Sequence, residues 1–122
     1  MTVVVDTSVL IDLLRGRLEA QRLLREARDD GPLHASEVTR LEVLAGMRPA
    51  EEDATREAFR AFVWHPLDAE IAGELGRRWL PGNRGIDAAD LAIAATAVSL
   101  DADLLTLNVK HYPMFDGLSA PY

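Results

Sequence analysis

The sequence contains no cysteine among its 122 residues. This absence excludes disulfide bonds, a thiolate nucleophile and a zinc–thiolate centre. Histidine occurs only three times, so a metal site in this chain would depend mainly on oxygen ligands. No apolar run reaches the roughly 18 residues that a membrane-spanning helix needs, and Met1 leads directly into TVVVD without the pattern of a signal peptide. We therefore expect a cytoplasmic protein with no membrane segment.

Basic residues are outnumbered: 13 lysines and arginines face 20 acids, which gives a net charge of −7. A protein that holds nucleic acid by neutralising many phosphates needs a basic surface, so this charge argues against that mode of binding. The arginines are concentrated in residues 15–28 and 77–84. Such clusters are typical of solvated helix faces paired with acids, although single arginines in them could also guide a phosphate backbone.

The length predicts a single domain, residues 1–122. In TVVVD, three valines follow one another without polar alternation, which indicates a buried strand in a parallel sheet covered on both faces. Strand and helix patterns alternate along the chain, so we predict an α/β fold with three layers, α/β/α, and a mostly parallel central sheet. The predicted strands are 2–6, 33–36, 63–67 and 102–107, and the predicted helices are 8–15, 18–28, 38–46, 51–62, 68–79 and 87–100.

Asp6 stands where the first predicted strand ends. In parallel α/β sheets, ligands bind beyond the carboxyl ends of the strands, so this is where a functional side chain is expected. The structural alternative is a helix N-cap. Thr7 and Ser8 are equally good caps and follow directly, so capping alone does not explain an aspartate at this position.

Glu42 lies in the predicted helix SEVTRLEVLAG. Counting by three and four places it on one face with Val38, Ala45 and Gly46, which are apolar or small. An ionised carboxylate is costly to bury unless it is paired or bound to a metal. Glu42 is therefore expected at the boundary of the core or partly buried, with a solvated surface glutamate as the alternative.

Asp87 and Asp90 open the otherwise apolar run GIDAADLAIAATAVS. A capping box accounts well for Asp87 as the N-cap, but less well for Asp90, because that position of the box prefers glutamate or glutamine. The segment that follows is apolar nearly all round, which predicts a buried central helix. Such a helix would hold Asp90 rigidly near the strand ends, as a functional site requires.

Asn108 follows the strand-like LLTL and is either a turn residue or a neutral oxygen ligand. If the three acids Asp6, Glu42 and Asp90 met in space, each pair of carboxylates about 4 Å apart would cost on the order of 4 kcal/mol without a compensating cation or proton. Ligand sets made of oxygen alone select magnesium or manganese rather than zinc. Convergence of these acids would therefore imply a hard divalent cation.

Four segments in this order, VVVDTSVLIDLL, TRLEVLAGM, DLAIAATA and LLTLNVKHYPMF, resemble the PIN-domain ribonucleases, and specifically the toxin component of VapBC toxin–antitoxin pairs. The resemblance spans almost the whole chain. It implies that Asp6, Glu42 and Asp90 are the catalytic and metal-binding acids. Asn108 occupies a fourth catalytic position, where many relatives have aspartate, and this difference makes a second tightly held metal less certain.

The resemblance also implies supporting residues. Thr7 or Ser8, together with Thr106, correspond to hydroxyl residues that orient the acids or touch substrate. Asp87 lies outside the matching segments, and we expect it to be a helix cap that tunes the potential of the site. The three histidines are expected to be ordinary strand or loop residues, with the last of them near the substrate path; they are His34, His65 and His111.

The implied activity is hydrolysis of RNA phosphodiester bonds with one or two Mg²⁺ or Mn²⁺ ions, which activate water and stabilise charge on the phosphoryl oxygens. Transfer RNA or ribosomal RNA would fit as substrate. The implied partners are a cognate antitoxin, whose helical tail occupies the substrate groove, and a second copy of the chain in a homodimer. Two alternatives remain open: a DNA or flap-type nuclease, and a degenerate PIN-like domain that binds RNA or a partner without cutting.

Overall fold

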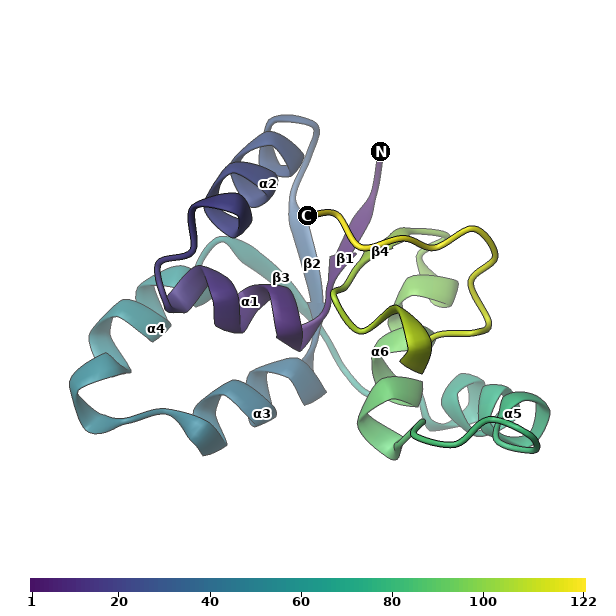
Figure 1. Ribbon diagram of the computed structural model, residues 1–122. Coiled ribbons are helices and arrows are strands. Elements are labelled where there is room, and N and C mark those ends of the chain that lie inside the picture. The colour runs from purple at the N-terminus through teal and green to yellow at the C-terminus, as the bar shows by residue number, and fades with distance from the viewer.

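The computed structural model describes residues 1–122, in which strands and helices alternate (Figure 1). Four strands, six α-helices and two short 3₁₀ helices follow one another along the chain. In chain order the elements are β1 (Val3–Val5), α1 (Thr7–Leu14), α2 (Leu18–Asp29), β2 (Leu33–Ser36), α3 (Glu37–Gly46), η1 (Pro49–Glu51), α4 (Glu52–Phe59), β3 (Phe62–His65), α5 (Ala69–Trp79), α6 (Ala88–Ser99), β4 (Asp103–Leu105) and η2 (Val109–His111).

The four strands form one sheet in the order β3-β2-β1-β4. Every neighbouring pair is parallel. Val3 is in register with Leu33 on one side and Asp103 on the other, so β1 is a central strand. The carboxyl ends of β1 and β4 therefore lie next to each other, and the residues that follow them, Asp6 and Thr106, meet at one edge of the sheet.

The side chains of β1 alternate between two cores, as the pleat of a strand requires. Val3 and Val5 pack in a cluster with buried residues of α1, α2, α3 and α4. Val4 points to the other face and packs with Ile93 and Ala94 of α6. Figure 1 shows α1 to α4 on one side of the sheet and α5 and α6 on the other. The prediction of a three-layer α/β/α fold is confirmed, and the sheet is parallel throughout.

Helix α6 is buried from Asp90 to Ala97. The many alanines of α6 let this helix lie close to the sheet and to α5. The two helices are so close that a Cβ added to Gly76 of α5 would stand only 3.1 Å from the side chain of Leu91 in α6. This tight packing fixes the helix start, so Asp90 is presented from a rigid element, as the sequence predicted. None of the helices is long and apolar enough to cross a membrane.

Several predicted boundaries are wrong, among them the end of the last predicted strand, which stops at Leu105 rather than at Leu107. The helix expected to run to Phe62 ends at Phe59, and Phe62 opens β3. Phe62 is buried in the core and pairs with Leu33, so strand pairing prevails there over helical periodicity. The same strand ends at His65 rather than at Leu67, because Pro66 has no N–H with which to continue the ladder.

Candidate active site

Asp6 lies at the end of β1 and is only 3% exposed. Its Oδ2 accepts hydrogen bonds from the Ser8 hydroxyl at 2.6 Å and from the Thr106 hydroxyl at 2.8 Å, and its Oδ1 accepts one from the Tyr112 hydroxyl at 2.8 Å. Asp6 is also the N-cap of α1, accepting from the Ser8 N–H at 3.4 Å. Capping is thus one of several contacts that hold this carboxylate in place.

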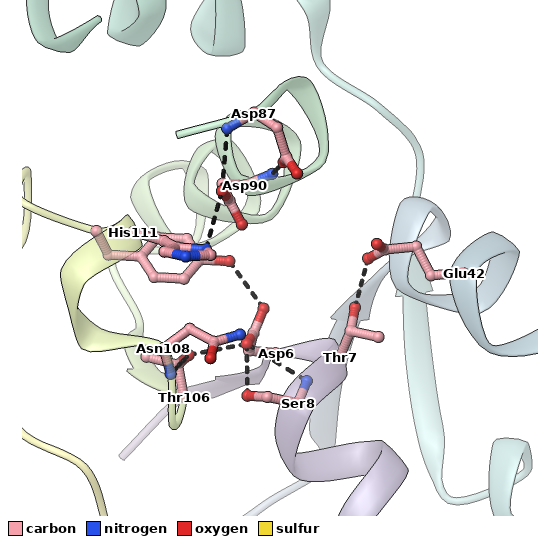
Figure 2. Close-up of polar contacts among 10 residues, drawn as sticks. Asp6, Thr7, Ser8, Glu42, Asp87, Asp90, Thr106, Asn108 and His111 are labelled. Carbon is pink, nitrogen blue, oxygen red and sulfur yellow. Dashed lines mark hydrogen bonds and ion pairs between the residues drawn. The ribbon is translucent and has the colours of Figure 1, made fainter. Parts of the chain in front are cut away.

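The loop after β4 is attached to Asp6 through the same hydroxyls. Thr106 is fully buried, and its Oγ1 accepts from the Asn108 N–H at 2.9 Å. The Ser8 Oγ accepts from the Leu107 N–H at 3.1 Å. The side chain of Asn108 is exposed and stands beside Asp6 in Figure 2. The start of α1 and the end of β4 therefore form one hydrogen-bonded unit around a single carboxylate.

Asp90 is 7% exposed at the start of α6. Its Oδ2 accepts from the Asp87 N–H at 3.0 Å, while Asp87 Oδ1 accepts from the Asp90 N–H at 2.9 Å, which completes a capping box. The sequence argument that Asp90 suits this box poorly is therefore wrong, because the shorter side chain closes the box here. The Nδ1 of His111 lies 3.2 Å from the same Oδ2. Figure 2 shows the other oxygen of Asp90 directed toward Asp6.

The surroundings of Asp90 disfavour its negative charge. Burial raises the pKa of the Asp90 carboxyl, and the nearby charge of Asp87 raises it further. The hydrogen bond from the Asp87 N–H and the contact with His111 act in the opposite direction and do not cancel the rise. A cation near Asp90 would relieve this cost, since an opposite charge favours the ionised form.

Glu42 reaches the site from α3 and lies at the surface, at the edge of the core. Its Oε1 accepts a hydrogen bond of 2.8 Å from the hydroxyl of Thr7, the residue after Asp6. The Thr7 hydroxyl is also hydrogen-bonded to the hydroxyl of Thr39 at 3.0 Å, and both threonines are buried. Glu42 is exposed, so the expected partly buried position is wrong and the surface alternative holds, because its face of α3 is left uncovered there. The hydrogen bond from Thr7 still links it to the end of β1.

The charges of the three acids all affect the pKa of one buried group, the hydroxyl of Tyr112. Burial raises the pKa of Tyr112 well above its usual range, and the negative charges of Asp6, Asp90 and Glu42 all add to that rise. Figure 2 shows the three carboxylates around this region, each from a different element. No three histidine, aspartate or glutamate side chains are placed to hold a metal ion together. The acids thus surround a common region without forming a closed set of ligands.

Sequence reasoning missed Tyr112 and Thr39 and gave His111 too small a part. Tyr112 is 1% exposed and contacts Asp6 across 106 positions of sequence, a relation that no local pattern encodes. The other two histidines behave as expected: His34 Nδ1 and His65 Nε2 are 2.8 Å apart on adjacent strands, bonded to each other rather than to any of the acids.

Comparison with known proteins identifies the family. The family model for the PIN domain matches residues 3–113. Ribonuclease VapC19 of Mycobacterium tuberculosis is 47% identical over 122 residues, which cover 97% of this chain and 98% of the relative. Ribonuclease VapC10 of the same organism is 41% identical over 98% of this chain and 92% of its own length.

Solved structures of toxin–antitoxin proteins have the same fold as this chain. A toxin–antitoxin complex from Klebsiella pneumoniae contains a chain that superposes with a TM-score of 0.79 and 29% identity, covering 99% of this chain and 98% of its own. VapBC2 from Rickettsia felis, bound to a DNA fragment from its promoter, also gives a TM-score of 0.79, over 98% of this chain and 97% of that one, and at 17% identity it shows the fold alone. The chain therefore belongs to the PIN-domain family, among the VapC-type ribonucleases that are the toxins of VapBC toxin–antitoxin pairs.

Proposed function

We propose that residues 1–122 form one PIN domain that hydrolyses RNA phosphodiester bonds at Asp6, Glu42 and Asp90, with Asn108 at the rim of the site. The observation that supports this assignment best is that Asp6, Glu42 and Asp90, delivered by the end of β1, by α3 and by α6, lie around one region of hydrogen-bonded side chains (Figure 2). Two of these acids, Asp6 and Asp90, are buried, and buried like charges disfavour the fold unless a cation or a proton compensates them.

The donor set fits a hard divalent cation. It consists of carboxylate oxygens in a chain without cysteine, which favours Mg²⁺ or Mn²⁺. Asp6, Asp90 and Glu42 would hold the ion, and their side chains have to draw together to do so. When bound, such an ion lowers the pKa of a water molecule and stabilises negative charge on the phosphoryl oxygens.

The remaining residues of the site position the acids. Ser8, Thr106 and Tyr112 donate hydrogen bonds to the two oxygens of Asp6 and so fix the orientation of its side chain. Thr7 orients Glu42. The Asp87 N–H and His111 fix the rotamer of Asp90 by holding Oδ2, which leaves the other oxygen for the centre of the site.

The relatives suggest the biological setting. The two mycobacterial relatives are ribonucleases by name, and the Klebsiella structure is a toxin–antitoxin complex. We therefore infer that this chain acts on transfer or ribosomal RNA in the cytoplasm, forms a homodimer, and is held inactive by a cognate antitoxin. The net charge of −7 suits a nuclease that meets phosphate locally, through a metal and a few arginines.

The test is cleavage of RNA by the purified chain with Mg²⁺ or Mn²⁺, in parallel with the variants Asp6→Asn and Asp90→Asn. A catalytic metal contributes several kcal/mol to the transition state, so each variant should lose roughly 10²–10³-fold in rate. Asp53→Asn is the control, because Asp53 is an exposed aspartate in the first turn of α4, outside the site.

Equal cleavage by all four proteins would identify a contaminating nuclease and remove the assigned site. Single-stranded DNA of the same sequence, digested side by side, separates a ribonuclease from a DNA nuclease. Calorimetric titration with Mn²⁺ tests the alternative of a PIN-like domain that binds without cutting. If the aspartates only cap helices, Asp90→Asn should leave Mn²⁺ binding unchanged; if Asp90 holds the ion, the variant should lose that binding.

A further inference from the structure

A cavity of about 280 Å³ adjoins the acidic site between α1, α3 and η1. Glu42 is one of its lining residues, so the cavity and the acidic site share a wall. Four of its lining residues are apolar, Ile11, Leu14, Val43 and Met47. The charged lining residues are two arginines, Arg15 and Arg48, and two glutamates, Glu42 and Glu51. This combination suits a ligand with a flat apolar body and a negatively charged group.

Arg15 and Arg48 are the two arginines that line the cavity, and neither is engaged in an ion pair. Four arginines form ion pairs with acids of the chain: Arg17, Arg40, Arg56 and Arg60. Arg15 and Arg48 are exposed and form none. Of the two lining acids, Glu51 accepts from the Arg48 N–H at the start of η1, and Glu42 belongs to the site where a divalent cation would offset its charge. Two guanidinium groups therefore remain for an anionic ligand.

We propose that this cavity receives the base of the nucleotide next to the scissile phosphate, while Arg15 and Arg48 contact its backbone phosphates. The proposal rests on the ribonuclease function proposed above. Unpaired RNA is recognised by splayed bases that pack against apolar side chains and guanidinium planes, and arginine is the preferred side chain for phosphate. Because Glu42 borders both regions, a phosphate held at the acids places the neighbouring base at the cavity. The RNA must therefore be unpaired at that position.

Gly46 offers a direct way to close the cavity. It lines the cavity at the end of α3, and a Cβ built on it meets no atom within 4 Å, so a side chain can start there without a clash and Gly46→Phe places a ring at the cavity. Gly73→Phe is the matched control: Gly73 lies exposed in α5, outside the cavity, and its Cβ likewise meets nothing within 4 Å. Both glycines have ordinary helical backbone, so the same substitution perturbs the chain similarly at the two positions.

The experiment measures binding of fluorescently labelled single-stranded RNA hexamers by anisotropy, in the Asp90→Asn background so that the RNA stays intact. Each hexamer of the series carries one abasic nucleotide, at a different position. We expect the loss of one particular base to weaken binding about tenfold, as expected for loss of one stacked base. Gly46→Phe should abolish this dependence on position, and Gly73→Phe should retain it.

The arginines are tested in the same assay. Arg15→Gln and Arg48→Gln together should weaken binding of every hexamer similarly and reduce the magnitude of the slope of log affinity against log salt by about 1.4, because two phosphate contacts to a single strand are lost. An unchanged salt slope would remove these residues from the RNA path. Circular dichroism melting of each variant confirms that a loss of binding does not reflect unfolding.

Three results overturn the proposal: abasic substitution that has no effect at any position, a Gly46→Phe variant that keeps the position dependence, or a Gly73→Phe variant that loses it equally. If Gly46→Phe leaves RNA binding intact and instead weakens capture of the purified antitoxin, the cavity binds a protein segment and the nucleotide assignment is wrong. Binding is measured without cleavage, so a failure of the ribonuclease function, seen as no cutting by the native chain with Mn²⁺, is distinguished from a failure of this subsite.

Discussion

Asp6 and Asp90 are the two buried acids of the chain, at 3% and 7% exposure, and they occupy opposite sides of the same site. Asp6 accepts four hydrogen bonds, three of them from hydroxyl groups. Asp90 accepts one backbone N–H, lies near His111, and has the negative charge of Asp87 beside it. Burial and that neighbouring charge raise the pKa of Asp90.

The difference separates two tasks that a metal-dependent site must perform. The β1 side holds a carboxylate that four hydrogen-bond donors orient. The α6 side holds a carboxylate whose charge is poorly compensated by the protein, and in the proposed metal site a cation would supply the missing interaction. In such a site, affinity for the ion comes mainly from the α6 side and geometry from the β1 side. Variants on the two sides should therefore behave differently.

The largest difference is expected for Tyr112→Phe. This variant removes the donor to Asp6 Oδ1 and leaves a buried charged acceptor unsatisfied, which should cost about 1.5–3 kcal/mol of unfolding free energy. Groups that orient metal ligands typically contribute 10–100-fold to metal affinity, so Mn²⁺ binding should weaken by about that factor. Urea denaturation and calorimetric titration measure the two effects.

Tyr122→Phe is a close control for that prediction. The Tyr122 hydroxyl also donates to an aspartate, Asp12 Oδ2, at 2.8 Å, but this pair lies outside the acidic site. Its removal should cost less stability, because Tyr122 is less buried than Tyr112, and should leave Mn²⁺ affinity unchanged. A Tyr112→Phe protein that binds Mn²⁺ as tightly as the native chain would show that Asp6 needs no orienting donor, and the contrast between the two sides would disappear.

The sequence predicted where the two carboxylates lie but not which side chains contact them. The valine run and the alanine-rich helix follow local rules of periodicity and burial, so the parallel sheet, its two covered faces and the positions of Asp6 and Asp90 were predicted correctly. The side chains that form hydrogen bonds with those carboxylates were not all predicted. Tyr112 reaches Asp6 only because the segment after β4 folds back against α6, and contacts made by such a return leave no periodic signal.

Asp90→Asn should have a smaller and opposite effect on stability. The asparagine carbonyl can still accept from the Asp87 N–H, while the unfavourable charge is removed. In the absence of metal at pH 7 we expect a gain of up to about 1 kcal/mol. Asp6→Asn should instead lose about 1–3 kcal/mol, because an amide cannot accept from all the donors that surround Asp6. Urea denaturation of both variants in EDTA compares them directly.

The gain from Asp90→Asn should also depend on pH. An acid whose pKa is raised by folding binds its proton more tightly in the folded state, so the native chain loses stability as pH rises from the unfolded pKa of about 3.9 through the folded value. The advantage of Asp90→Asn should therefore grow across this window and stay constant above it. A gain that is the same at pH 3.5 and pH 7 would mean that the variant acts through packing rather than through charge.

The smallest effect is expected for His111→Gln. The side chain of His111 is 40% exposed, and its contact with Asp90 at 3.2 Å is longer than any of the three hydroxyl contacts of Asp6. Interactions of partly exposed charged pairs are worth about 0–1 kcal/mol, and glutamine retains a donor, so stability should change by less than about 0.5 kcal/mol. Mn²⁺ affinity should fall less than the roughly tenfold minimum expected for Tyr112→Phe. If calorimetry shows equal losses for the two variants, Asp90 is held as firmly by its partner as Asp6 is by its own, and the two sides of the site are equivalent.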